Sequence, residues 1–200
     1  MSHPVEFYFD FSSPYGYFAA AKIDSLAAKH GRTTIWRPIL LGAIFKVTGQ
    51  QPLTTIPLKG GYALHDLTRS ARWFGVPFKM PGKFPIATTA PCRAYYWLHD
   101  RDPAAARILA QALYHAYFVE NRDISNPEIT VNVAVKLGHD KDAVAQALND
   151  PAVKERLKIE VDAAVERGVF GSPYIVVDGE PFWGSDRLDQ VEKWLAQGPW

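Results

Sequence analysis

Cysteine is nearly absent from this chain of 200 residues, which contains only Cys92. A single thiol excludes an intrachain disulfide, a Cys-x-x-Cys redox centre and any zinc site built from several cysteines. The six histidines show no His-x-x-x-His or similar cluster. Because such clusters are the usual signature of a protein metal site, we expect no metal here.

An excess of charge of either sign is also absent. The chain has 22 Lys and Arg against 21 Asp and Glu, a formal net charge of +1. This balance creates no field that favours nucleic acid or an anionic membrane as partner. No apolar run approaches membrane-spanning length, and the first residues lack a basic and then apolar leader. The simplest inference is a cytoplasmic protein with a small-molecule partner.

The most informative stretch begins with the aromatic, alternating segment from Val5 to Phe11, which predicts a buried strand. It ends in a Ser-Ser-Pro-Tyr-Gly turn before an Ala-rich helical pattern. Pro14 suits the first turn of a helix, so Ser12 or Ser13 is the expected N-cap. A serine there lies beside unpaired N–H groups and the positive end of the helix dipole, an environment that favours an anion or thiolate. On local features alone, simple capping is the commoner role.

The next segments predict a βαβ unit. Tyr15 to Lys29 has the periodicity of one helix, and Thr33 to Leu40 has the β-branched and aromatic content of a second strand. Strand, helix and strand in so short a span indicate parallel strands joined by a right-handed crossover. Leu41 to Val47 is consistent with a short helix, and Thr48 to Lys59 has the Gly and Pro content of a surface loop.

From residue 60 onward helical periodicity replaces strand signals, until strands return at Tyr174 to Asp178 and Glu180 to Trp183. Asp178-Gly179 between them is a strong hairpin signal. A last amphipathic helix runs from about Arg187 to Leu195. The expected helices of the middle region lie at about 62–74, 92–98, 103–117, 128–137, 139–148 and 152–167. This order predicts an α/β, thioredoxin-like domain of residues 1–59 and 166–200 with an inserted all-helical domain of residues 60–165.

In a thioredoxin-like layout, the loop before the hairpin faces the turn after the first strand. Here that loop is Val-Phe-Gly-Ser-Pro-Tyr, with Pro173 directly before the strand. A cis bond before Pro173 would turn Ser172 toward the N-terminus of the first helix. The backbone edge at Ser172 would then be free to pair with a peptide-like ligand. Alternatively, Pro173 merely starts the strand.

Three ordered motifs resemble the glutathione-dependent 2-hydroxychromene-2-carboxylate isomerases. This family belongs with the kappa-class glutathione transferases in the DsbA-like branch of the thioredoxin superfamily. The resemblance spans nearly the whole chain, and it implies a homodimeric enzyme of aromatic catabolism. The motifs are Phe-Asp-Phe-Ser-Ser-Pro-Tyr at 9–15, Phe-Gly-Ser-Pro at 170–173 and Phe-Trp-Gly-Ser-Asp-Arg-Leu at 182–188.

The resemblance implies that Ser13 is the catalytic residue, at the position where a DsbA-like oxidoreductase carries its attacking cysteine. Gly16 stands at the position of the resolving cysteine, so disulfide exchange is excluded and the thiol must come from glutathione. The implied glutathione-binding residues are Ser13, Pro14, Tyr15, Gln50, Lys59, Ser172, Pro173, Trp183, Gly184, Ser185, Asp186 and Arg187.

Within this set, the resemblance assigns the parts of the tripeptide. Ser172 pairs with its cysteinyl part, Ser185 and Asp186 hold its γ-glutamyl end, and Gln50 and Lys59 reach its glycyl end. A carboxylate such as Asp186 suits an ammonium group, although the residue could equally cap the last helix. Gln50 departs from the Asn of the kappa-like pattern.

The second substrate is expected to be a small hydrophobic or aromatic acid. Three of the expected pocket residues replace the basic and polar groups and the tyrosine of characterised isomerases, which weakens any claim to the same acid. Phe45, Phe84 and Trp183 would wall an apolar pocket. The pocket residues are Phe45, Thr54, Thr55 and Phe84.

The resemblance thus implies a glutathione-dependent cis–trans isomerase of a conjugated aromatic oxo or hydroxy acid, acting by reversible thiolate addition. Two alternatives stay open. One is a kappa-like glutathione S-transferase, which leaves glutathione attached to its substrate. The other is a redox-dead thioredoxin-like module that binds a peptide or protein along the Ser172 edge.

Overall fold

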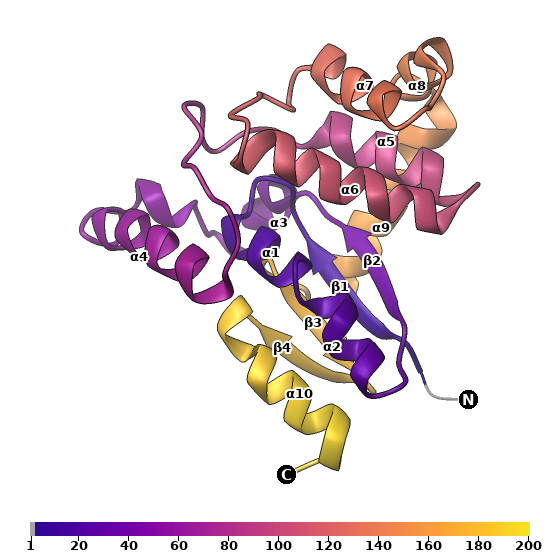
Figure 1. Cartoon of the computed structure of the whole chain (residues 1–200). Coiled ribbons are helices and arrows are strands. Elements are labelled where there is room, and N and C mark those ends of the chain that lie inside the picture. The colour runs from indigo at the N-terminus through magenta and orange to yellow at the C-terminus, as the bar shows by residue number, and fades with distance from the viewer. Residues whose placement is uncertain (1–2) are drawn as a thin grey trace.

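A computed structural model describes residues 3–200 (Figure 1). Within them the sheet has four strands in the order β2-β1-β3-β4, namely β1 (Val5–Phe9), β2 (Thr34–Pro38), β3 (Tyr174–Val177) and β4 (Glu180–Trp183). β1 pairs in parallel with β2 and antiparallel with β3, and β3 pairs antiparallel with β4. This topology confirms the predicted parallel βαβ half and the antiparallel hairpin half of a thioredoxin-like fold.

Alternate side chains of β1 enter two separate cores, as the pleat of a strand requires. Phe7 and Phe9 are fully buried in the larger core, where their rings stack at 5.1 Å and meet the edge of Trp36. Tyr8 lies in the smaller core on the other face, with Tyr174 against its ring. The sheet is therefore buried on both faces, which explains the dense aromatic sequence of this strand.

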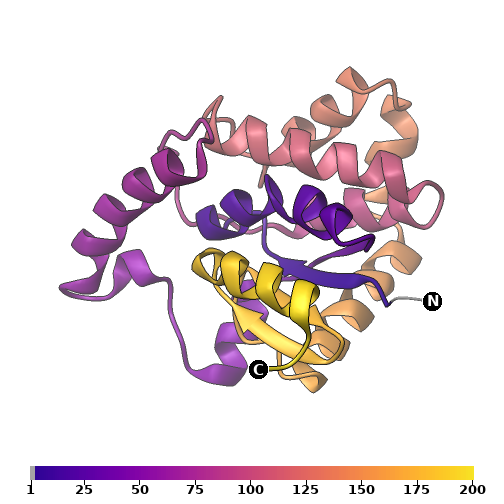
Figure 2. The ribbon, with the colours of Figure 1, turned by 60° about the horizontal axis from the view of Figure 1, so that its bottom comes forward.

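Helices cover both faces of the sheet (Figure 2). The larger core receives α1 (Pro14–Ala20), α2 (Ile23–Lys29) and α10 (Leu188–Gln197). The smaller core receives Ile44 of α3 (Leu41–Thr48) and Ala164 of α9 (Pro151–Glu166). The strand that carries the Ser-Ser-Pro turn thus lies at the centre of the molecule.

The middle of the chain is helical, as predicted. Its helices are α4 (Lys59–Phe74), α5 (Thr89–His99), α6 (Pro103–Phe118), α7 (Pro127–Lys136) and α8 (Lys141–Ala147), followed by α9. In Figure 1, α5 to α8 gather at one end of the sheet, whereas α4 stands apart beside α1. Side-chain oxygens of Asp102, Asn126, Asp140 and Asp150 accept the first free N–H groups of α6, α7, α8 and α9, so most helix starts follow their caps. The boundary at residue 60 between two domains stays a prediction.

The prediction of one helix from Tyr15 to Lys29 is wrong, because the chain turns at Ala21 and Lys22 and starts a new helix at Ile23. Asp24 explains the break. Its carboxylate accepts hydrogen bonds from the Trp36 indole at 2.9 Å and from the hydroxyl of Thr34, which fasten the first turn of α2 to β2. This tie to a strand ten residues away is invisible in helical periodicity.

Within residues 3–200, no helix combines the length and the apolar character that crossing a membrane requires.

Candidate active site

Ser13 caps the N-terminus of α1. Its backbone is extended, with φ −92° and ψ 112°, and its Oγ accepts a hydrogen bond from the Gly16 N–H at 3.0 Å. Pro14 occupies the first helical position, as the turn sequence predicted. The residue is 6% exposed. Of the two serines considered for this role, Ser13 is therefore the cap, and its hydroxyl lies where the α1 dipole favours negative charge.

The loop before the hairpin meets this serine directly. The bond between Ser172 and Pro173 is cis, and the Ser172 carbonyl accepts a hydrogen bond from Ser13 Oγ at 2.9 Å. Ser172 Oγ in turn accepts one from the Asp10 N–H at 2.9 Å. The Gly184 N–H donates to the Pro173 carbonyl at 3.0 Å. All three motifs singled out in the sequence therefore lie side by side.

Gly16 has no space for a side chain. A Cβ there would lie 2.8 Å from Ser172 Oγ and 2.8 Å from the Tyr114 hydroxyl oxygen. Tyr114 is buried, and its hydroxyl is held by the Asp10 carbonyl at 3.0 Å. The position at which a disulfide oxidoreductase would carry its resolving cysteine is thus blocked by neighbouring atoms as well as lacking a thiol.

The third motif forms the turn η2 (Ser185–Arg187) between β4 and α10. Ser185 is buried, whereas the Asp186 side chain is 72% exposed and pairs with Arg187 at 3.0 Å. A Cβ on Gly184, whose φ is +112°, would clash with Asp186 Oδ1, so glycine lets this carboxylate fold back over the loop. The capping role considered for Asp186 is wrong, because α10 has no side-chain cap.

Tyr15 connects α1 to a carboxylate that sequence reasoning missed. Its hydroxyl donates to Asp66 Oδ2 on α4 at 2.7 Å. Burial raises the pKa of Tyr15, and the Asp66 carboxylate that accepts its hydrogen bond raises it further. Although burial opposes it, hydrogen bonds from Tyr15 and Arg69 hold the pKa of Asp66 below its usual value. Helical periodicity does not single out Asp66, because its contact with Tyr15 joins residues 51 positions apart.

The residues predicted between 45 and 59 lie on a surface excursion. Phe45 is on α3, Gln50 follows that helix, Thr54 and Thr55 are in the short 3-10 helix η1 (Leu53–Thr55), and Lys59 begins α4. Gln50, Thr55 and Lys59 are exposed. No hydrogen bond within residues 3–200 joins any of these residues to Ser13, so their roles stay predictions.

Phe84 belongs to a proline-rich connection that lies against the serine turn. The Ile86 N–H donates to Ser12 Oγ at 3.1 Å, and the Tyr117 hydroxyl donates to the Lys83 carbonyl at 2.8 Å. Ser12, the other serine considered as the N-cap, therefore holds this connection against the turn. Half-buried Phe84 packs on the larger core. Trp183, predicted at the same site, is 53% exposed and meets the Phe170 ring at 4.9 Å.

The one cysteine takes no part in this site. Cys92 is fully buried in α5, and burial raises the pKa of its thiol well above the usual value. A protonated, inaccessible thiol is not a nucleophile. Across residues 3–200, no group of three or more His, Cys, Asp or Glu side chains is placed to hold a metal ion.

Comparison with known proteins gives the same family as the motifs. The model of the DSBA-like thioredoxin domain matches residues 4–196. A 2-hydroxychromene-2-carboxylate isomerase of Sphingobium xenophagum is 31% identical over 98% of this chain and 99% of its own. Glutathione S-transferase kappa 2 of Caenorhabditis elegans is 28% identical over 96% of this chain and 92% of its own.

A solved structure of a 2-hydroxychromene-2-carboxylate isomerase superposes with a TM-score of 0.87 at 29% identity, covering 96% of this chain and 94% of the other. Sequence motifs, topology and whole-chain similarity agree. The chain therefore belongs to the 2-hydroxychromene-2-carboxylate isomerase family, in the DSBA-like thioredoxin group that also includes the kappa-class glutathione transferases.

Proposed function

We propose that this protein is a glutathione-dependent isomerase that interconverts the cis and trans forms of a conjugated aromatic oxo or hydroxy acid. The observation that carries the proposal is the 2.9 Å hydrogen bond that joins Ser13 Oγ to the Ser172 carbonyl at the N-terminus of α1. Relatives named as isomerases support the reaction, and relatives named as glutathione transferases support the thiol. The same proposal places the protein in the cytoplasm, in the breakdown of aromatic compounds.

The donor set fits glutathione. A hydroxyl at a helix N-terminus suits a thiolate, and a cis-Pro loop with an accessible backbone suits the cysteinyl peptide groups. The exposed Asp186 carboxylate and the Asp66 carboxylate that accepts the hydrogen bond of the Tyr15 hydroxyl are matched to an α-ammonium group. Buried Ser185, next to Asp186 in the chain, suits an α-carboxylate. We propose that Lys59 and Gln50 take the glycyl end of the same ligand.

Bound glutathione would supply a thiol nucleophile for reversible addition to the conjugated double bond. The role of Ser13 follows from its single proton: the hydroxyl can donate to only one acceptor at a time. In this structure it donates to the Ser172 carbonyl, and in the complex it turns to the sulfur, which frees that carbonyl for the ligand. The Gly16 N–H still holds Oγ from the other side, so the donor stays aimed at the developing charge.

The acid substrate would lie between the proline-rich connection and the excursion that follows α3. Phe84 is the best supported wall of this pocket, because the hydrogen bond from the Ile86 N–H holds its segment against Ser12, next to Ser13. Phe45, Thr54 and Thr55 would complete it. An apolar wall with few polar groups suits a small hydrophobic or aromatic acid.

Product analysis tests the reaction class. The protein is incubated with glutathione and conjugated aromatic acids. The masses of the products are measured by mass spectrometry and the geometry of their double bonds by NMR. An unchanged mass with altered geometry of the double bond supports isomerisation. A gain of one glutathione unit supports the kappa-like transferase instead, a candidate that the 28% identity to glutathione S-transferase kappa 2 favours. No binding of glutathione at millimolar concentration in calorimetry would support the redox-dead binding module and overturn both enzyme proposals.

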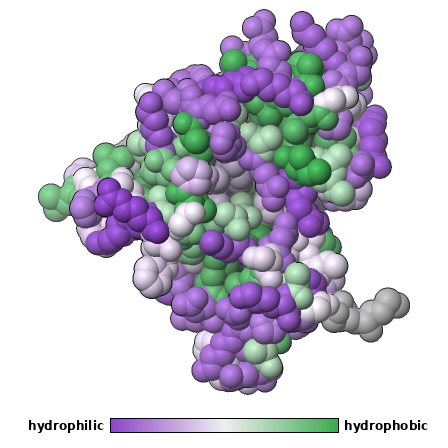
Figure 3. Space-filling view, in the orientation of Figure 1, coloured by the Kyte–Doolittle hydropathy of each residue, from purple (hydrophilic) through white to green (hydrophobic). Residues whose placement is uncertain are grey.

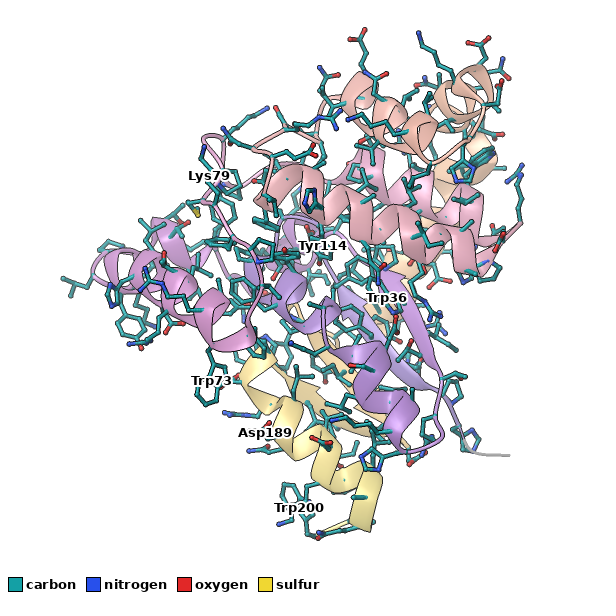
Figure 4. The ribbon with its side chains drawn as sticks, in the orientation of Figure 1. Trp36, Trp73, Lys79, Tyr114, Asp189 and Trp200 are labelled. Atoms are coloured by element: carbon teal, nitrogen blue, oxygen red, sulfur yellow. The ribbon has the colours of Figure 1, made fainter. Side chains whose placement is uncertain are left out.

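Replacing Asp186 by asparagine should weaken glutathione binding about tenfold while leaving kcat at saturation nearly unchanged, because a lost carboxylate removes a partner of the ammonium group in ground and transition states alike. Asp189→Asn is the matched control: this exposed carboxylate lies on α10 and is labelled in Figure 4. Calorimetric titration with glutathione gives the dissociation constant of each variant, and steady-state rates at saturating glutathione give kcat. Equal affinities for the two variants would remove Asp186 from the site.

We also propose that the protein forms a homodimer. Hydrophobic residues are exposed at the end of α4 that lies farthest from the sheet (Figure 3). Leu58, just before α4, is 96% exposed, and Trp73, near its other end, is 83% exposed. Large exposed apolar side chains at both ends of one helix are candidate parts of an interface. Light scattering should give twice the mass of one chain; a monomer mass at micromolar concentration would contradict the proposal.

A further inference from the structure

Asp10 is a buried carboxylate beside the candidate site, with 3% of its surface exposed. Its Oδ1 accepts hydrogen bonds from the Ser12 N–H at 2.7 Å and the Thr88 hydroxyl at 3.1 Å, and its Oδ2 accepts one from the Leu41 N–H at 2.7 Å. All three donors are uncharged. Leu41 is the first residue of α3 and Thr88 precedes α5. The carboxylate is therefore stabilised by two backbone N–H groups, one of them at the start of α3, and by one hydroxyl, in place of a cation.

The main chain of the same residue holds both halves of the site. The Asp10 N–H donates to Ser172 Oγ at 2.9 Å. Its carbonyl accepts hydrogen bonds from the Ser13 N–H at 2.8 Å and from the Tyr114 hydroxyl at 3.0 Å. The main chain of Asp10 thus contacts both Ser13 and Ser172.

We propose that Asp10 is a positioning residue of the glutathione site. Its carboxylate joins the serine turn to the starts of α3 and α5, and thereby keeps Ser13 Oγ and the Ser172 carbonyl at hydrogen-bond distance before the ligand arrives. The inference rests on the proposed function, because it assigns Asp10 to the same site. Asp10 acts through Ser13 and Ser172, without touching the ligand.

The carboxylate titrates within an accessible pH range. Burial raises the pKa of Asp10 to about 6, although the hydrogen bonds from Leu41, Ser12 and Thr88 oppose the rise. Below that pH one carboxyl oxygen of Asp10 carries a proton and faces one of its three donors, so that hydrogen bond is lost. The titratable groups facing it are the Cys92 thiol of α5 and the hydroxyls of Tyr114 and Tyr117 on α6. Burial raises the pKa of each, so they stay neutral from pH 5 to 7.

The free energy of unfolding should also depend on pH through Asp10, in the absence of any ligand. The folded-state pKa of Asp10 lies above the usual value of 3.8, so folding favours the protonated carboxyl. Its contribution to the free energy of unfolding is therefore fully present below pH 3.8 and is lost as the pH rises through about 6. Asp10→Asn removes this dependence. Urea unfolding of the full chain from pH 4 to 7 should therefore give a difference between wild type and variant that changes with pH; a constant difference would contradict the titration.

The positioning role is tested with S-methylglutathione, which lacks an ionisable thiol, by calorimetry at pH 5 and 7. Wild type should bind it about tenfold more weakly at pH 5. Asp10→Asn should bind weakly at both pH values. Thr88→Val, which deletes one donor to the carboxylate, should keep the dependence with its midpoint moved to higher pH. If Asp10→Asn fails to fold, the pH midpoint of binding by Thr88→Val decides: a midpoint equal to that of wild type would overturn the proposal. An Asp10→Asn variant with the affinity and pH profile of wild type would overturn the proposal.

A crystal structure of ligand-free Asp10→Asn separates this inference from the proposed function. The distance from Ser13 Oγ to the Ser172 carbonyl should increase from 2.9 Å to beyond hydrogen-bond reach. An unchanged distance would overturn the positioning role. If wild type binds neither glutathione nor its S-methyl derivative, the proposed function fails, while this comparison still decides what Asp10 does.

Discussion

Replacing Ser13 by alanine is expected to lower kcat of the glutathione-dependent reaction by a factor of about 10² to 10³. The variant removes one preorganised donor to a developing negative charge, and donors of this kind contribute about 2.7 to 4 kcal/mol to transition-state stabilisation. The buried hydroxyl is already held by the Gly16 N–H at 3.0 Å. It therefore needs little reorganisation in the transition state, and its full stabilising effect is expected. Steady-state rates at saturating glutathione measure the loss.

Ser12→Ala is the matched control for this variant. Ser12 is the neighbouring serine, and its Oγ accepts only the Ile86 N–H among the hydrogen bonds of residues 3–200. Its loss should loosen the proline-rich connection and raise KM for the acid substrate, with less than about a fivefold change in kcat. Equal kcat values for the two alanine variants would remove Ser13 from the chemistry.

Replacing Gly16 by alanine should destabilise the protein and weaken glutathione binding together. The new methyl group would lie 2.8 Å from both the Tyr114 hydroxyl and Ser172 Oγ. Neither atom moves freely, since each is hydrogen-bonded to Asp10. Overpacking of this kind costs about 1 to 3 kcal/mol, which outweighs the gain of about 0.5 to 1 kcal/mol that alanine brings to a helix interior. Urea unfolding and calorimetry with glutathione measure the two effects.

Gly61→Ala provides the contrasting substitution. Gly61 lies in the first turn of α4, and a Cβ there meets nothing within 4 Å. Only the helix-propensity term remains, so the free energy of unfolding should rise by up to about 1 kcal/mol. If both alanine variants gain stability, the contacts around Gly16 are looser than this account requires.

Local chemistry was enough to predict much of the fold. Pro14 preceded by serine placed the start of α1, and Asp178-Gly179 placed the hairpin, where both residues have positive φ of +54° and +93°. Each of these features depends on a few consecutive residues, whose conformational preferences are strong. The pairing of Ser13 with Ser172 required more, because it joins residues 159 positions apart. It was expected only from the order of the motifs and the thioredoxin-like layout.

The features that sequence reasoning missed depend on long-range contacts. Asp10 stands in the opening motif, but its partner Thr88 lies 78 positions away. Asp66 is one acid among many on helices until Tyr15, 51 positions earlier, donates to it. The closed space at Gly16 is likewise set by Tyr114, on another helix. Periodicity and capping rules contain no information about such contacts, which the tertiary fold alone creates.

The most direct test of the account is a crystal structure of the protein with glutathione. The sulfur should lie within hydrogen-bond distance of Ser13 Oγ, with the cysteinyl backbone paired against Ser172 and the ammonium group beside Asp186. A structure in which glutathione at millimolar concentration is absent from this site, or binds with its sulfur out of reach of Ser13, would contradict the account.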